Sequence, residues 1–251
     1  MTRIARMFKT IEQRKIHVLS GKAEVIEHAK SHGRVLAVPG KYDHLEQVVP
    51  HLPTGTRDLV DRKSPPPNLS SYDVLIVGCP GALPLRRWRD PINEFLRAGG
   101  VMVTSDWCLH NMIEKLFPGT IRNRGSAWGK YPLRVWTPGH PLLDGLSDLN
   151  GTRWVVKAWS QRIEVNDPRR VQVVLDAPKM RKENAILVCF SVGAGLVVHA
   201  ISHFCLQGSD ERGNYVSAFI LTNAIDDAMW RKHHIGVNAQ PPAAGIHAHW
   251  Y

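Results

Sequence analysis

The sequence predicts an α/β fold, a three-layer sandwich whose sheet is mainly parallel and carries antiparallel β additions. Residues 72–110 contain the apolar run Tyr72–Val77, a charged amphipathic segment over Leu85–Arg97, and a second apolar run, Val101–Thr104. A helix that links two strands in this way makes them parallel, so both following loops leave at the same edge of the sheet. Further along, the turn Val192–Gly195 joins two strand-like runs, which indicates an antiparallel hairpin.

Residues 1–33 are basic and only weakly periodic, and we interpret them as an N-terminal extension that leads to the sheet. Apolar spacing favours a helix at Ile11–Val18 and another at Ala23–Ala29, with Ser20-Gly21 between them. Val35–Val38 is the first strand, because an apolar run there ends at Pro39-Gly40. Two further elements are expected before residue 72: a helix over Tyr42–Val49 and a short strand at Leu59-Val60.

After residue 110 the pattern changes from alternating strand and helix to mostly strand. A helix is expected at Asn111–Leu116, and residues 120–150 show few strong signals, which predicts a long surface loop around Tyr131–Trp136. Helical spacing then predicts one closing helix over Tyr215–Trp230. Residues 34–232 are expected to form the α/β domain, followed by a C-terminal tail at 233–251. The predicted strands of the second half are Arg153–Trp159, Val171–Leu175, Ala185–Phe190 and Leu196–Ile201.

The composition is that of a soluble globular protein, with 43% apolar and 22% charged residues among 251. The 32 Lys and Arg outnumber the 22 Asp and Glu, which gives a formal net charge of +10. Such a charge attracts nucleic acid, acidic lipid or an acidic protein partner. A solvated basic surface, including Arg86, Arg87 and Arg89, is the favoured explanation, because no nucleic-acid-binding motif accompanies the charge.

The cysteines are widely spaced and form no CxxC pair, and no secretory hydrophobic segment follows Met1. A reduced intracellular compartment is therefore the simplest expectation, and we predict a cytoplasmic protein. No apolar run approaches the roughly 18 residues of a membrane span. The four cysteines are Cys79, Cys108, Cys189 and Cys205.

Four segments together resemble the class I glutamine amidotransferase-like superfamily, and among its branches the ThuA-like and related divergent proteins. Tyr72–Gly81 resembles the strand and glycine-rich turn of the oxyanion loop, and Gly99–Trp107 resembles the strand that leads to the nucleophile elbow. His140–Leu146 is similar to a recurrent HP-x-x-x-GL segment, and Gly193–His203 to the late hairpin that ends at a histidine. The resemblance covers roughly residues 34–230 and implies a flavodoxin-like sandwich.

The sequence departs from the superfamily at the elbow. An amidotransferase has a cysteine there, inside a G-x-C-x-G pattern, whereas this chain reads Thr104–Cys108 with Asp106 nearest to the nucleophile position. A carboxylate does not readily replace a thiolate in forming and releasing a glutamyl thioester. We therefore expect no glutaminase activity. Cys108 lies two residues further on. We interpret it as a packed thiol in preference to a nucleophile.

Asp106 and His203 are the candidate catalytic pair, since each follows a predicted strand. Asp106 is interpreted equally well as a general base or as the cap of the next helix. His203 is interpreted as its acid or base partner, or as a structural histidine bonded to a loop carbonyl. The candidate ligand-binding residues, of which the first three offer backbone N–H groups, are Gly78, Cys79, Gly81, Trp107 and His110.

We predict no metal site and no cofactor. His199, His203 and Cys205 share one face of an extended chain, which is compatible with metal ligation, but no second cluster accompanies them.

Three functions remain open from the sequence. The first is a divergent amidotransferase-like protein without glutaminase activity that binds a small ligand or a partner protein in a multi-component system. The second is a hydrolase or lyase that uses Asp106 and His203 on a small polar substrate, sugar-like as the ThuA resemblance implies. The third is an accessory protein that binds nucleic acid through its positive charge.

Overall fold

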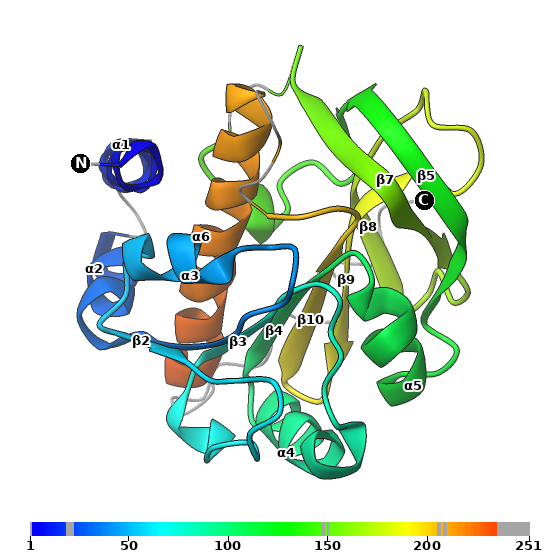
Figure 1. The fold of residues 1–251 in the computed structure, drawn as a ribbon. Coiled ribbons are helices and arrows are strands. Elements are labelled where there is room, and N and C mark those ends of the chain that lie inside the picture. Colours follow the sequence, from blue (N-terminus) through cyan, green and yellow to red (C-terminus); the bar gives the residue numbers. More distant parts are fainter. Residues whose placement is uncertain are drawn as a thin grey trace.

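The computed structural model describes residues 2–18, 23–146, 149, 151–204, 207 and 210–234. Within these residues one ten-stranded sheet forms the centre of the molecule (Figure 1). Its main path runs β2-β1-β3-β4-β10-β9-β7-β5, while β8 pairs with β6 and β9 beside this path. The strands are β1 (Arg34–Val38), β2 (Thr56–Leu59), β3 (Val74–Val77), β4 (Val101–Ser105), β5 (Ile121–Pro132), β6 (Arg134–Val135), β7 (Arg153–Val165), β8 (Val171–Asp176), β9 (Ala185–Val192) and β10 (Gly195–Ala200).

Helices cover both faces of the sheet and complete the predicted three-layer sandwich (Figure 1). The long helix α6 packs on β3, β4 and β7, and α1 and α2 pack against α6. Helix α4 contacts β9 and β10 on the other face. The α-helices are α1 (Arg3–Val18), α2 (Ala23–His32), α3 (Leu45–Val48), α4 (Leu85–Arg97), α5 (Glu114–Leu116) and α6 (Glu211–His234).

The parallel half of the sheet sets the position of the site. Strands β1, β3, β4 and β10 pair in parallel, and the residues of β3, β4 and β10 are all buried. Burial on both faces explains why these strands are mostly apolar in the sequence, without a polar residue at every second position. Because they run the same way, the segments that follow them leave at one edge. The α/β fold, the parallel unit and the hairpin at Val192–Gly195 are confirmed.

The long surface loop predicted around Tyr131–Trp136 is wrong. Residues 121–132 form β5, which pairs with β7 in antiparallel register, and Arg134-Val135 forms β6. Most side chains of β5 are exposed or only half-buried, and the pairing has two register shifts. An exposed, irregular strand shows no regular apolar alternation, so the sequence carries no strand signal there.

The N-terminal helices are present, and α1 begins earlier than its apolar spacing indicates. It buries Phe8 and Ile11 against the rest of the core, and Lys15 forms an ion pair with Asp226 of α6. The predicted Ser20-Gly21 break lies outside the described residues.

Two predicted helices are shorter or less regular than expected. Only Leu45–Val48 of the predicted Tyr42–Val49 helix is α-helical, because Asp43 is buried and accepts a hydrogen bond from the Cys79 N–H. The helix expected at Asn111–Leu116 is a π-helical turn over Leu109–Ile113 followed by α5.

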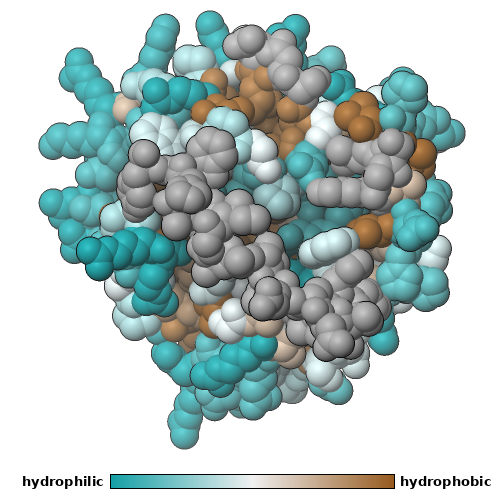
Figure 2. Space-filling view, turned by 180° about the vertical axis from the view of Figure 1, so that it is seen from behind, coloured by the Kyte–Doolittle hydropathy of each residue, from teal (hydrophilic) through white to brown (hydrophobic). Residues whose placement is uncertain are grey.

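The predicted tail at 233–251 lies outside the described residues, apart from the end of α6. None of the described helices is long and apolar enough to cross a membrane. Figure 2 shows hydrophilic side chains over much of the rear face, with hydrophobic residues in smaller patches between them. This distribution fits a surface that is largely in contact with water.

His199 of β10 makes stability depend on pH. Its ring is buried beside the hydroxyl of Thr104, with Nδ1 2.9 Å from Oγ1, and burial lowers its pKa from 6.5 to about 3. Between these values the unfolded chain binds the extra proton, so the free energy of unfolding falls as pH drops from 6.5 towards 3. This single group contributes at most about 1.4 kcal/mol per pH unit.

We expect a His199→Asn variant to lose less stability than the parent chain between pH 7 and pH 4.5. Urea unfolding at several pH values measures the two slopes. Equal slopes would show that His199 does not stay neutral in the folded chain.

Candidate functional site

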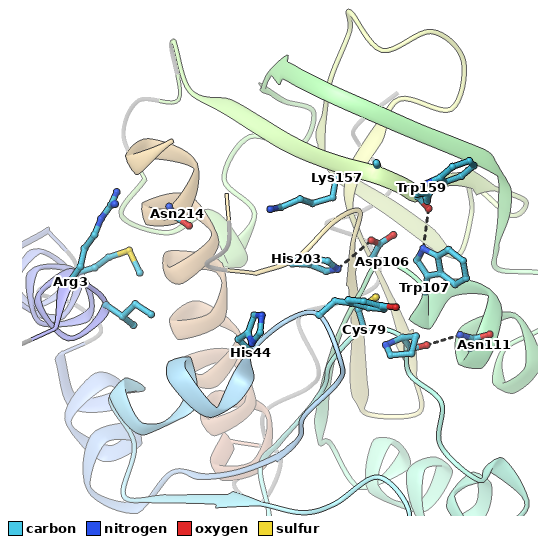
Figure 3. A pocket seen from close by; sticks show the side chains of 15 residues that line it. Arg3, His44, Cys79, Asp106, Trp107, Asn111, Lys157, Trp159, His203 and Asn214 are labelled. Atoms are coloured by element: carbon cyan, nitrogen blue, oxygen red, sulfur yellow. Dashed lines mark hydrogen bonds and ion pairs between the residues drawn. The ribbon is translucent and has the colours of Figure 1, made fainter. Parts of the chain in front are cut away.

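A cavity of about 950 Å³ lies at the edge where the parallel strands end (Figure 3). The segments that follow β1, β3, β4 and β10 each contribute to it, and β7, α1 and α6 complete the wall. Its lining residues are Tyr42, His44, Cys79, Pro80, Asp106, Trp107, Asn111, Lys157, Ala158, Trp159 and His203, with Arg3, Ile4 and Met7 of α1 and Asn214 of α6.

Asp106 lies directly after β4 on a sharp turn. Its φ is 47°, a left-handed conformation that Asp tolerates better than most residues, and its side chain is buried. The carboxylate accepts hydrogen bonds from the hydroxyl of Ser160 at 3.0 Å and from the backbone N–H of Gln161 at 2.9 Å. These bonds tie the turn to β7, so the side chain does not serve as a helix cap.

His203 follows β10 and faces Asp106 across the floor of the cavity (Figure 3). Its Nε2 lies 3.4 Å from Asp106 Oδ2. Burial raises the pKa of Asp106 and lowers the pKa of His203, while the attraction between the two charged forms acts against both shifts. The predicted pair is therefore brought together, with the proton affinities of its members shifted towards each other.

Cys79 is the third member of this group. A cysteine sulfur, a carboxylate oxygen and a histidine nitrogen, from Cys79, Asp106 and His203, lie within 4.8 Å of one another. Burial raises the pKa of the Cys79 thiol, the nearby carboxylates raise it further, and the backbone N–H of Trp107 lowers it. The three residues offer sulfur, oxygen and nitrogen to a cation, and no other described residues form such a group of three.

Cys108 lies away from the cavity. Its side chain is fully buried, and its Sγ donates to the carbonyl of Val77 at 3.4 Å. Gly81, at a φ of 67°, packs so closely that an added Cβ would come within 2.7 Å of that sulfur. Burial also raises the pKa of Cys108 well above its usual value. This geometry supports the interpretation of Cys108 as a packed thiol rather than as a nucleophile.

The other predicted residues fall in different places. Trp107 lines the cavity and donates from Nε1 to the carbonyl of Trp159 at 2.9 Å (Figure 3). His110 does not line it and instead bonds Glu114 through Nδ1 at 2.9 Å. Gly78 lies behind the wall beside Asp43. Cys205 lies outside the described residues, and His199 is in the core, so their expected common face is not described.

Sequence reasoning missed several residues of the site. Asp43 accepts hydrogen bonds from the Cys79 N–H and from Ser105 Oγ, and burial raises its pKa to about 6. The polar stretch directly after the first strand is a signal for it, because that strand also ends at the binding edge. The sequence carries no such signal for Lys157 and Trp159, because β7 approaches the turn at Asp106 only in the folded structure.

Comparison with solved structures identifies the fold. A glutamine amidotransferase from Thermotoga maritima matches 79% of this chain and 98% of its own, with a TM-score of 0.53 and 15% identity. A putative ThuA-like protein from Bacteroides uniformis matches 77% and 89%, with a TM-score of 0.51 and 18% identity. The chain has the class I glutamine amidotransferase-like fold.

The same amidotransferase-like fold also occurs within larger proteins. The chain matches a β-galactosidase from Rahnella over 74% of its length, with a TM-score of 0.52 and 14% identity, and spans only 30% of that enzyme. No family model and no curated protein matches the sequence. At these identities the likeness establishes the fold and leaves the chemistry to the residues of the site.

Proposed function

We propose that this chain is a divergent class I amidotransferase-like protein that does not hydrolyse glutamine and that binds a small, negatively charged polar molecule in the cavity. The observation that carries the proposal is the position of Asp106 on the turn after β4. Asp106 stands on the sharp turn after β4 with a left-handed backbone, where the resemblance places a cysteine nucleophile.

The neighbouring thiols support the absence of glutaminase chemistry. Cys108 is buried behind the turn and bonded to a carbonyl, and the Cys79 thiol has a raised pKa. A nucleophilic cysteine needs thiolate character, which a positive environment supplies. Here the groups around Cys79 include the carboxylates of Asp43 and Asp106, which oppose ionisation.

The charge on the cavity wall supports an anionic ligand. Lys157 extends from β7 over the cavity (Figure 3), and Asp106 is the one carboxylate among the described residues that line the cavity. The cavity also has aromatic walls from Tyr42, Trp107 and Trp159, which suit the apolar face of a ring. A sugar phosphate combines these properties in one small molecule.

We expect glucose 6-phosphate to quench the tryptophan fluorescence of the chain and to raise its melting temperature, whereas neutral glucose does neither at the same concentration. A Lys157→Met variant should bind glucose 6-phosphate at least about tenfold more weakly, because each 1.4 kcal/mol of lost ion pairing is a factor of ten. Lys130→Met is the matched control, since Lys130 is exposed on β5 and does not line the cavity.

Ammonia release from L-glutamine tests the other half of the proposal. The parent chain should release none above the uncatalysed rate. Catalytic turnover of glutamine, or equal effects of Lys157→Met and Lys130→Met on glucose 6-phosphate binding, would refute the proposal.

A further inference from the structure

We propose that Cys79, Asp106 and His203 form a zinc site at the floor of the cavity. The inference deepens the proposed function, because the ion would lie where the anionic ligand is expected to bind. The three side chains come from segments that follow β3, β4 and β10, so residues far apart in sequence converge at one point (Figure 3).

The spacing of the three ligand atoms fits one small cation. Atoms that bind a tetrahedral zinc ion at about 2.0–2.3 Å lie about 3.3–3.8 Å from one another. Asp106 Oδ2 and His203 Nε2 are already 3.4 Å apart, and all three candidate atoms lie within 4.8 Å. The sulfur therefore has to approach the other two atoms by about 1 Å at most.

A buried nitrogen that makes no hydrogen bond is the second observation. His203 is 8% exposed, and its buried Nε2 has no hydrogen-bond partner among the described residues, although it points at Asp106. A buried polar atom without a hydrogen bond is costly, and a bound ion removes that cost. Neutral imidazole is also the form of histidine that binds metals.

The ligand types select the metal. One sulfur, one nitrogen and one oxygen suit zinc, whereas magnesium and calcium prefer sets made of oxygen alone. A thiolate from Cys79 and the carboxylate of Asp106 together balance the two charges of the ion. The proton of the Cys79 thiol leaves to solvent when the sulfur binds.

Neighbouring groups already hold Asp106 in orientation. The hydroxyl of Ser160 and the backbone N–H of Gln161 donate to its two carboxylate oxygens. Such outer hydrogen bonds are a regular feature of protein metal sites and commonly contribute 10- to 100-fold in affinity.

A Cys-His-Asp nucleophile relay explains the same residues less well. In a relay the histidine uses opposite ring nitrogens, one for the nucleophile and one for the carboxylate. Here a single nitrogen of His203 lies near both the Cys79 sulfur and the Asp106 carboxylate, which is the arrangement of a shared central ion.

Three protein ligands leave one position of a tetrahedral zinc ion open. In zinc sites that act on ligands, this fourth position takes water or a substrate oxygen. The cavity opens above the three residues, and Lys157 lies on its wall. The open position and the ammonium group together suit a phosphate or carboxylate oxygen.

The test uses the tag-free full chain, stripped with a chelator and titrated with ZnCl2 by calorimetry, and with CoCl2 by absorption spectroscopy. We expect one Zn²⁺ per chain and a cobalt–thiolate charge-transfer band. Cys79→Ser should abolish the band and weaken Zn²⁺ binding by more than about 100-fold. His203→Gln should weaken Zn²⁺ binding similarly while its circular dichroism and melting temperature remain close to those of the metal-free parent.

Two controls exclude other sites. Cys108→Ala should keep the cobalt band, because Cys108 faces the core. A His247→Ala/His249→Ala chain, which lacks the last two histidines of the sequence, should keep full Zn²⁺ binding. The inference is overturned if the parent chain binds no stoichiometric Zn²⁺ or if the band survives Cys79→Ser.

These experiments can refute the proposed metal site and the proposed anion site independently of each other. Lys157→Met should keep Zn²⁺ binding and lose affinity for glucose 6-phosphate. A parent chain that binds the sugar phosphate through Lys157 but takes no Zn²⁺ leaves the proposed function standing without the ion. If the parent chain binds stoichiometric Zn²⁺ but Lys157→Met does not change its affinity for the sugar phosphate, the metal site stands and the proposed anion site is refuted.

Discussion

A Gly40→Ala variant is expected to lose about 3 kcal/mol or more of unfolding free energy. An added Cβ at Gly40 would lie 1.9 Å from the carbonyl oxygen of Cys79 and 2.6 Å from the carbonyl carbon of Gly78. Both are backbone atoms, so no side-chain rotation relieves the clash. The same carbonyl of Cys79 accepts hydrogen bonds from the N–H groups of Lys41 and Tyr42, which the displacement would break.

The matched control for this prediction is Gly139→Ala. Gly139 has a φ of 73° but no atom within 4 Å of an added Cβ, so alanine there costs only the backbone strain of about 1–2 kcal/mol. Urea unfolding measures both variants. Equal losses would mean that the contact between the segments after β1 and β3 is looser than the structure has it.

Trp154→Ala is the second substitution with a large expected effect. Trp154 of β7 is fully buried, and its Nε1 donates to the carbonyl of Ile201 at 2.7 Å. Truncation leaves a cavity and an unpaired carbonyl two residues before His203, and we expect a loss of about 3–5 kcal/mol. Trp154→Phe keeps most of the ring and should lose about 1–3 kcal/mol, chiefly from the hydrogen bond.

Trp128→Ala is its control, since Trp128 on the neighbouring strand is 77% exposed. That variant should change the free energy of unfolding by less than about 0.5 kcal/mol. A similar loss in Trp154→Ala and Trp128→Ala, measured by chemical denaturation, would contradict the assigned role of the buried indole.

The parallel centre of the fold could be predicted because its strands are buried on both sides. Val74–Val77 is a continuous apolar run that ends at Gly78, and the apolar run at the start of Val101–Ser105 follows Gly100, so this pattern is visible in the sequence alone. The meeting of Asp106 and His203 follows from the same topology, since both residues come directly after strands of one parallel set. Order along the chain therefore carried real information about the centre of the site.

The outer half of the sheet and the cavity wall could not be predicted in the same way. Strand β5 faces water on most positions, so its residues carry no apolar period. Asp43 bonds a residue 36 positions away, and Ser160 bonds one 54 positions away. Such contacts depend on how strands pair and bend, and a left-handed φ at Asp106 or Trp159 leaves no mark in a single sequence.

Helix α1 gives the basic first segment a role in the shape of the cavity. Arg3, Ile4 and Met7 face the cavity while Phe8 and Ile11 anchor the same helix in the core. A shortened chain that starts at the first strand would lack the side of the cavity that α1 forms. It would also expose to solvent the surface of α6 that α1 and α2 cover. Because exposed apolar surfaces promote association, we expect such a shortened chain to self-associate.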